Sequence, residues 1–428
     1  MSRILKHAKS INGVITTPGD KSITHRALVM GALADGDTKI SKFLRCADTI
    51  STISCLQKLG ISIEDLGNNE VLVHGRGMHG LSAPSTVLNV GNSGTTTRLL
   101  TGILSAQNFV SEIRGDDSLN RRPMEMIIKP LTQMGACISG NGEHCCTPLH
   151  IDGSQLKGIR YEITVSPSQV KTSILFAGLF AKGPTELSES FFSRNHTEQI
   201  MRLFGADLMT DGTTIRLNPP ESLAPQEIEI PGDLSSAAFL IAAALILPDS
   251  QLLLKNVGIN ETRLGFISAV QNMGGNITLQ NATHGIEPCA DILVKSSKLH
   301  GIVLEKDIIP SVIDELPIIT VLCCFAEGRS EIRDAYDLRV KESDRIDAMS
   351  ENLKRMGADI TTLDDGMIIE GGKPLHGAIV GSRLDHRIAM SLAVAGVCAE
   401  GNTELIGSEC VSVSYPQFYN DLESVCNR

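Results

Sequence analysis

The chain has 428 residues, a formal net charge of −11 at pH 7, 42% hydrophobic residues and 39 glycines. This length exceeds one ordinary hydrophobic core, so we expect a soluble, turn-rich protein with at least two domains. The absence of tryptophan, the 4% aromatic content and the acidic balance argue against a nucleic-acid partner. The longest apolar run, 237–247, is too short to cross a bilayer, so neither a membrane partner nor a signal peptide is expected.

The eleven cysteines include no C-x-x-C pair. This usage is typical of reduced thiols in a reducing compartment and favours neither a disulfide framework nor a zinc site. We therefore expect a cytoplasmic protein without a bound metal.

Residues 18–33, "PGDKSITHRALVMGAL", place Lys21, Ser22 and Arg26 at the start of an apolar helix. The unpaired N–H groups at a helix start already attract anions, and two cations strengthen that preference. The stretch is not a P-loop, because Asp20 separates the glycine from the lysine. The simpler alternative is an ordinary capped surface helix.

One pattern recurs along the chain: a helical stretch, then a glycine, then a short strand. The glycine of each copy is typical of a left-handed residue that ends a helix. These glycines are Gly60, Gly135, Gly205, Gly274 and Gly357, spaced by 69 to 83 residues. A sixth copy would begin with the helical pattern at 418–428, which lacks a strand, and the extended N-terminal segment 3–17 is the simplest source of one.

A second repeat, Pro-Gly-Asp, occurs at 18–20 and again at 231–233. The chain therefore divides into two halves of three units each, with a hinge at these two tripeptides. We expect a discontinuous domain of residues 1–18 and 233–428, and an inserted domain of residues 19–232. Alternating helices and strands with short connections predict an α/β repeat fold.

Basic, hydroxyl or acidic residues also stand before or at the start of several later helical patterns. Each alone has a structural explanation, as a helix cap, a solvated arginine pair or a partner of the helix dipole. Pro123, directly after Arg121 and Arg122, predicts the first turn of a helix. Together these residues indicate helix starts that converge on one cleft for several anions, where a carboxylate such as Asp314 or Glu315 is a natural general base. The candidates are Gly91, Gly94, Arg121, Arg122, Ser166, Ser168, Gln169, Lys171, Ser193, Arg194, His196, Asp314, Glu315, Arg339, Lys341, Glu342, Asp344, Arg345, Asp385, His386 and Arg387.

The motifs "PGDKSITHRAL", "NSGTTTRLL", "SLNRRPM", "SQVK", "IDELP", "LRVKESDRI" and "LDHRIAM" resemble the enolpyruvyl transferase family, most closely its 5-enolpyruvylshikimate-3-phosphate synthase branch. The match runs over both halves in order and spacing. The resemblance implies two globular domains, each of three βαβαββ units in an inside-out α/β barrel, joined by two crossover linkers. It also implies a monomer without cofactor or metal, whose partners are two small-molecule substrates.

The implied reaction moves the enolpyruvyl group of phosphoenolpyruvate to the 5-hydroxyl of shikimate 3-phosphate. Asp314, Glu342 and Lys21 would be catalytic, with Asp314 accepting the hydroxyl proton and Glu342 transferring a proton at the methylene carbon. Shikimate 3-phosphate would be bound by Lys21, Ser22, Arg26, Ser166, Ser168, Gln169, Arg194, Asp314 and Lys341. Phosphoenolpyruvate would be bound by Lys21, Gly94, Arg122, Gln169, Arg345 and Arg387.

The chain departs from the family pattern at a few positions. Pro167 stands where a serine is usual, and Ser166 would take that serine's place. Val413 replaces a lysine that binds phosphoenolpyruvate in many members, and the "NSGTTTRLL" loop differs from the commoner "NAGTAMRP" at Thr96 and Leu99. The alternatives are a UDP-N-acetylglucosamine enolpyruvyl transferase, whose loop cysteine has no counterpart here, and a non-catalytic anion-binding protein of the same fold.

Overall fold

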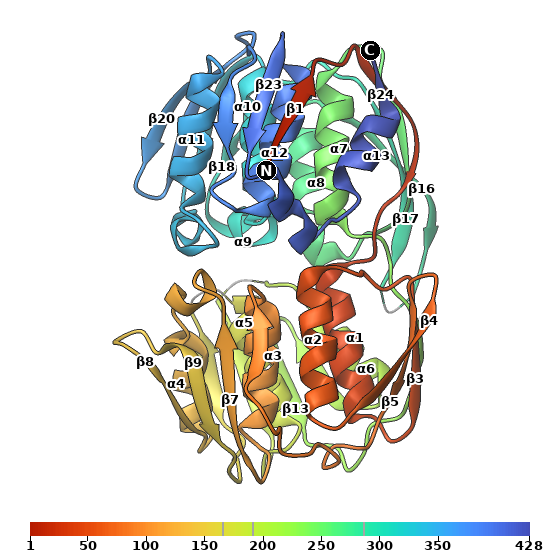
Figure 1. Cartoon of the computed structure of the whole chain (residues 1–428), viewed down its shortest axis with the longest axis vertical. Helices are drawn as coiled ribbons and strands as arrows, with labels where there is room; N and C mark the ends of the chain where they lie inside the picture. Colours follow the sequence, from red (N-terminus) through yellow and green to blue (C-terminus); the bar gives the residue numbers. More distant parts are fainter. Residues whose placement is uncertain (165–166, 191, 286) are drawn as a thin grey trace. The chain divides into compact units, whose positions relative to one another are not determined.

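The computed structural model describes residues 1–164, 167–190, 192–285 and 287–428. The chain forms two compact units (Figure 1). Unit 1 comprises Met1–Pro18 and Pro231–Arg428, and unit 2 comprises Gly19–Ile230. Each unit has its own hydrophobic core of buried aliphatic side chains.

The three sheets of unit 2 share one arrangement. Two parallel strands lie side by side, and two antiparallel strands follow. In two of the sheets a buried helix connects the two parallel strands, as a βαβ connection requires. In the third, the parallel partner of the strand Asp37–Ser41 is the strand Glu227–Glu229 from the end of the unit. The sheets, in spatial order, are β14 (Glu227–Glu229), β3 (Asp37–Ser41), β5 (Glu70–His74) and β4 (Ser62–Gly67); β6 (Leu88–Gly91), β7 (Val110–Gly115), β9 (Cys146–Asp152) and β8 (Cys137–Asn141); and β10 (Arg160–Ile163), β11 (Thr185–Glu189), β13 (Thr214–Asn218) and β12 (Asp207–Asp211).

Two sheets of unit 1 repeat this arrangement, and its third sheet has two parallel strands and one antiparallel strand. Its sheets are β2 (Ser10–Thr16), β15 (Gln251–Gly258), β17 (Cys289–Lys295) and β16 (Asn276–Thr283), with β24 (Cys426–Asn427) added beside β2; β18 (Val303–Leu304), β19 (Gly328–Ile332), β21 (Gly366–Gly371) and β20 (Asp359–Leu363); and β22 (Ile379–Gly381), β23 (Asn402–Ile406) and β1 (Ser2–Lys6). In the last sheet β1 pairs antiparallel with β23, and Figure 1 shows the two together. The N-terminal segment thus supplies the missing strand, as predicted.

Three buried helices pack together at the centre of each unit. Their sequences are apolar around most of the helix circumference, which is typical of helices enclosed by other elements. In α7, for example, every residue from Leu234 to Leu245 is buried. The central helices are α1 (Lys21–Leu33), α3 (Gly94–Leu104) and α5 (Pro167–Gly178) in unit 2, and α7 (Leu234–Ile246), α10 (Leu316–Phe325) and α12 (His386–Cys398) in unit 1.

The remaining helices are amphipathic or short, and most of them connect strands on the outer side of the repeats. They are α2 (Ala47–Lys58), α4 (Glu125–Gln133), α6 (His196–Leu203), α8 (Gly265–Asn272), α9 (Ile309–Val312), α11 (Arg345–Arg355) and α13 (Phe418–Val425). A strand, a central helix, a strand, an outer helix and two further strands make one repeat. This is the βαβαββ unit, so the predicted α/β repeat fold is confirmed.

The repeated glycines adopt the backbone that the sequence pattern predicts. Gly60, Gly135, Gly205, Gly274 and Gly357 have φ between +89° and +103°, a region that favours glycine. Each follows the end of an outer helix, so the prediction of left-handed helix ends is confirmed.

One expectation about local structure, the start of the helix after Arg122, needs correction. The prediction that Pro123 lies in the first turn of a helix is wrong, because α4 begins at Glu125 and Arg121 ends a short 3-10 turn.

Within the described ranges, no single helix is long and apolar enough to span a membrane. One pair of helices, Lys306–Val312 and Leu316–Phe325, passes that test only together and is bent by 109°.

Candidate active site

The start of α1 in unit 2 carries the first predicted cations. The Asp20 carboxylate caps this helix and accepts a hydrogen bond from the N–H of Ile23 at 2.9 Å. The Lys21 ammonium forms an ion pair with the Asp48 carboxylate of α2 at 3.0 Å. Asp48 thereby holds the ammonium at a helix N-terminus, where the backbone also favours an anion.

Arg26, one turn further along α1, ties three helix starts together. Its guanidinium is buried and donates hydrogen bonds to Thr197 Oγ1 of α6 at 2.7 Å and to Thr172 Oγ1 of α5 at 2.8 Å. It also donates to the carbonyl of Ser22 at 2.9 Å, and Ser22 itself is half-buried. The structure thus brings the N-terminal turns of α1, α5 and α6 to one place, as the sequence predicts.

The remaining candidates of this group belong to the start of α5 and to the loop before α6. Ser168 and Gln169 are half-buried in the first turn of α5. Arg194 is half-buried two residues before α6 begins at His196. Ser166, the proposed substitute for the family's serine, lies outside the described residues.

A second group of candidate residues surrounds the start of α3. Ser93 caps the helix, and Gly94 is its first residue. A β-carbon at Gly94 would lie 2.5 Å from Arg98 Nη1 and 3.4 Å from Arg122 Nη1, so glycine lets both guanidinium groups approach the backbone. Arg122 is buried and donates to Asn92 Oδ1 at 2.8 Å. Gly94 and Arg122 are therefore neighbours, although 28 residues separate them in sequence.

In unit 1, the predicted base stands before α10. The Asp314 carboxylate lies 3.8 Å from the guanidinium of Arg345 and 3.8 Å from that of Arg387. Arg387 Nη1 also donates to the Asp314 backbone carbonyl at 2.7 Å. The Asp314 side chain is 20% exposed, so its carboxylate is oriented by two cations and still open to a ligand.

Arg345 connects three of the candidate residues of unit 1. Its side chain is 1% exposed, and it contacts Asp385 Oδ2 at 2.8 Å and Glu342 Oε2 at 2.6 Å. Burial alone would lower the pKa of Arg345, but the carboxylates of Asp385, Glu342 and Asp314 outweigh it and raise the pKa. Arg345 therefore stays charged and holds Glu342, which is 21% exposed, near Asp314.

Lys341 belongs to the same cluster. Burial is the main cause that lowers its pKa, and the Arg345 cation acts in the same direction, while the Asp314 carboxylate opposes them. A lysine ammonium with a lowered pKa gives up its proton more readily than the ammonium of an exposed lysine. It therefore suits a site where an anionic substrate and a proton transfer meet.

The starts of the three central helices of unit 1 also converge. Ser235, in the first turn of α7, donates a hydrogen bond to Glu315 Oε1, directly before α10. Arg387, in the first turn of α12, lies 3.6 Å from the same carboxylate oxygen. In each unit, therefore, several helix starts and charged side chains lie close together. In unit 2 these side chains are mainly cations and hydroxyl groups. In unit 1 they include two accessible carboxylates beside arginines. This chemistry suits anion binding with acid–base catalysis.

Comparison with known proteins agrees with this chemistry. A family model described as EPSP synthase (3-phosphoshikimate 1-carboxyvinyltransferase) matches residues 5–422. A 3-phosphoshikimate 1-carboxyvinyltransferase of Brevibacillus brevis is 48% identical over 98% of this chain and 99% of its own. One from Geobacillus thermodenitrificans is 49% identical over 98% of each chain. The chain belongs to the EPSP synthase family.

A solved EPSP synthase structure from Acinetobacter baumannii has a TM-score of 0.88 and 44% identity to this chain, covering 99% of this chain and 98% of that one. Membership of the EPSP synthase family confirms the resemblance read from the motifs. It also shows that the chain is an enzyme of the transferase class.

Sequence reasoning missed buried ion pairs that hold the EPSP synthase candidates in place. Lys171, 1% exposed, lies 3.0 Å from Glu189 and 2.7 Å from Glu198. Ser193, next to Arg194, donates to the second oxygen of Glu189. This network therefore fixes both the start of α5 and the loop before α6. The one available signal was that Lys171 stands at the start of an apolar helical pattern, because none of its partners is local in sequence.

A comparable network in unit 1 involves Arg263, which sequence reasoning did not single out. Its guanidinium donates to Ser235 Oγ and lies 3.7 Å from both Asp233 and Glu315. Arg263 thereby holds the start of α7 close to Glu315, the residue that follows Asp314. Within the described residues, no group of three or more His, Cys, Asp or Glu side chains is arranged to hold a metal ion.

Proposed function

We propose that this chain transfers the enolpyruvyl group of phosphoenolpyruvate to the 5-hydroxyl of shikimate 3-phosphate through the residues described above. The products are 5-enolpyruvylshikimate 3-phosphate and inorganic phosphate, a step of the shikimate pathway toward chorismate and aromatic amino acids. The observation that carries the residue assignment is the position of the Asp314 carboxylate, 3.8 Å from both Arg345 and Arg387.

Asp314 acts as the base in this proposal. Its carboxylate accepts the proton of the 5-hydroxyl while the oxygen forms a bond to C2 of phosphoenolpyruvate. Glu342 delivers a proton to the methylene carbon of phosphoenolpyruvate, so that this carbon becomes a methyl group and the double bond is lost. The phosphate then leaves with its bridging oxygen, and loss of one methyl proton restores the vinyl group. Positioned cations balance the negative charges throughout.

The binding roles follow the two groups of helix starts. Phosphoenolpyruvate is held by Arg345 and Arg387 of unit 1 together with residues of unit 2, namely Lys21, Gly94, Arg122 and Gln169. Shikimate 3-phosphate is held by Lys21, Ser22, Arg26, Ser166, Ser168, Gln169, Arg194, Asp314 and Lys341. The ion pair of Lys21 with Asp48 and the hydrogen bonds of Arg26 support these roles, since they place cations at helix starts.

Phosphate release is the test of the proposed reaction. The purified protein is incubated with phosphoenolpyruvate and either shikimate 3-phosphate or UDP-N-acetylglucosamine. We expect rapid phosphate release with shikimate 3-phosphate and none above background with the sugar nucleotide. Release with the sugar nucleotide alone would assign the chain to the other branch of the enolpyruvyl transferases. Release with neither acceptor would contradict a catalytic function.

We also propose that the enzyme works as a monomer in the cytoplasm. The eleven free cysteines, of which six are buried, support a reducing compartment. Sedimentation velocity at micromolar concentration should give a single species of 45.9 kDa. A dimer mass would contradict the first half of this proposal.

A further inference from the structure

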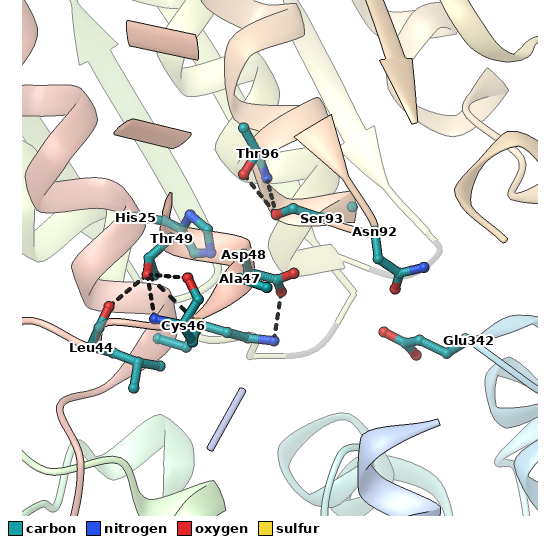
Figure 2. Close-up of polar contacts among 12 residues, drawn as sticks. His25, Leu44, Cys46, Ala47, Asp48, Thr49, Asn92, Ser93, Thr96 and Glu342 are labelled. Atoms are coloured by element: carbon teal, nitrogen blue, oxygen red, sulfur yellow. Dashed lines mark hydrogen bonds and ion pairs between the residues drawn. The ribbon is translucent and has the colours of Figure 1, made fainter. Parts of the chain in front are cut away.

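Four polar side chains form a continuous hydrogen-bonded chain through the interior of unit 2. His25 Nδ1 of α1 lies 2.7 Å from Thr52 Oγ1 of α2, which lies 2.7 Å from Thr96 Oγ1 of α3. Thr96 Oγ1 in turn lies 2.6 Å from Ser93 Oγ, the cap of α3 (Figure 2). All four residues are at most 1% exposed. The chain therefore joins a buried imidazole to the helix start that carries Gly94.

The burial of His25 sets the direction of these hydrogen bonds. Desolvation lowers the pKa of His25 well below its ordinary value, and the nearby cations Lys21 and Arg26 lower it further, so the ring is neutral at pH 7. Within the residues that the structure describes, His25 Nε2 has no hydrogen-bond partner. An unpaired buried N–H is rarer and costlier than an unpaired acceptor. The ring proton therefore resides on Nδ1 and is donated to Thr52.

The remaining bonds follow from the single proton of each hydroxyl. Thr52 accepts from His25 and must donate to Thr96. Thr96 accepts from Thr52 and must donate to Ser93. Ser93 Oγ then accepts twice, from the Thr96 hydroxyl at 2.6 Å and from the Thr96 N–H at 3.1 Å. The proton of the Ser93 hydroxyl takes part in neither of these two hydrogen bonds.

That proton has no acceptor in the described part of the chain, because every hydrogen bond of Ser93 Oγ involves Thr96. Both accepted bonds come from the first turn of α3, so the O–H bond points away from this turn. A buried hydroxyl proton without an acceptor is unfavourable, and an anion bound at the helix start would satisfy it.

We propose that Ser93 is a further substrate-binding residue, whose hydroxyl donates a hydrogen bond to an anionic oxygen of phosphoenolpyruvate at the start of α3. This inference rests on the proposed function, which places phosphoenolpyruvate at Gly94 and Arg122. Thr96, Thr52 and His25 are positioning residues, since they keep Ser93 acting as an acceptor toward the protein and as a donor toward the substrate.

Steady-state kinetics of Ser93→Gly and Ser93→Thr test the donor role. Glycine caps a helix almost as well as serine, so Ser93→Gly removes the hydroxyl while keeping α3 intact. We expect its KM for phosphoenolpyruvate to rise about ten- to hundredfold, the effect of losing a hydrogen bond to a charged group. The KM for shikimate 3-phosphate should stay within about twofold, and Ser93→Thr should restore most of the loss.

The positioning role is tested by Thr52→Val, with Thr101→Val as the matched control. Thr101 is equally buried in α3, but among the described residues its hydroxyl bonds only the carbonyl of Thr97. We expect Thr52→Val to raise the KM for phosphoenolpyruvate several-fold at nearly constant kcat, and Thr101→Val to leave it unchanged. Equal effects of both variants would show a merely structural contribution and would overturn the positioning role.

The outcomes separate this inference from the proposed function. An enzyme whose Ser93→Gly variant keeps the parental KM for phosphoenolpyruvate would retain the proposed reaction and overturn the role of Ser93. A rise in the KM for shikimate 3-phosphate alone would also overturn it. A wild-type protein without transfer activity would overturn both. The direction of the chain is tested by ¹⁵N NMR of His25, where a proton on Nε2 instead of Nδ1 would contradict the argument.

Discussion

At the scale of single residues, the catalytic proposal depends most on Asp314. Its carboxylate is oriented by Arg345 and Arg387, so it needs little movement to meet a substrate hydroxyl. We predict that Asp314→Ala binds shikimate 3-phosphate nearly as well as the parent but has kcat lower by about 10²–10⁴-fold, the usual cost of losing a positioned base. Calorimetric binding and phosphate release measure the two quantities separately.

Glu351→Gln is a suitable control for this variant. Glu351 lies on the exposed side of α11 and pairs with Arg355 and Arg383 at the surface. Its removal should change kcat by less than about twofold. Near-parental turnover of Asp314→Ala would mean that this residue only neighbours the helix start, and that the base lies elsewhere.

Arg387 is the second residue on which the division of roles depends. Its guanidinium donates to the Asp314 carbonyl and lies near two carboxylates, and its side chain is still 12% exposed. We predict that Arg387→Ala raises the KM for phosphoenolpyruvate far more than the KM for shikimate 3-phosphate, because a charge-assisted contact to an anion is lost. A change confined to shikimate 3-phosphate would reverse the proposed roles.

At the scale of elements, α1 carries a buried histidine that should make the stability of the protein depend on pH. His25 is fully buried, and desolvation lowers its pKa well below the ordinary value. Below about pH 6.5 the unfolded chain therefore binds a proton that the folded chain does not, so acidification favours unfolding. His25 therefore changes the free energy of unfolding by at most about 1.4 kcal/mol per pH unit.

The predicted comparison is between the wild type and His25→Asn, which cannot be protonated in this range. As pH falls from about 7 to 5, the wild type should lose stability faster than the variant. Urea unfolding of both proteins at several pH values measures the difference. If the free energies of unfolding of the two proteins changed in parallel with pH, His25 would take up the proton equally in the folded and unfolded states.

The central helices and their starts are the elements that the sequence predicts best. Apolar runs behind a capping aspartate, such as Asp20, Asp233 and Asp385, have a local cause, because the cap and the first turn are adjacent in sequence. The glycine-ended outer helices are equally local. Candidate residues placed at these starts could therefore be named from the motifs before any tertiary contact was known.

The contacts that hold these residues could not be predicted in the same way. Thr52 bonds His25 across 27 residues, and Lys171 pairs with Glu198 across two elements. Such partners depend on how helices pack, which no local pattern reports. The start of α4 at Glu125 was missed for a related reason, since a proline suits a first helical turn and also the residues just before it.

At the scale of the whole molecule, the chain passes between the units twice, at Pro18–Gly19 and at Ile230–Pro231. Two crossings at neighbouring Pro-Gly-Asp tripeptides would suit a hinge. Since the proposed roles draw cations from both units, we predict that shikimate 3-phosphate favours a closed form by offsetting their repulsion. Small-angle scattering should show a smaller radius of gyration with this ligand. An unchanged radius in an active enzyme would contradict closure.

The central claim is that the enolpyruvyl group moves intact onto the 5-oxygen of shikimate 3-phosphate. The most direct measurement is ¹³C NMR of the reaction with phosphoenolpyruvate labelled at its methylene carbon. We predict one labelled vinyl ether at the 5-position of shikimate 3-phosphate, formed in equal amount to the released phosphate and nearly absent with Asp314→Ala. Labelled pyruvate in place of the ether would show that the protein only hydrolyses phosphoenolpyruvate, and would contradict the account.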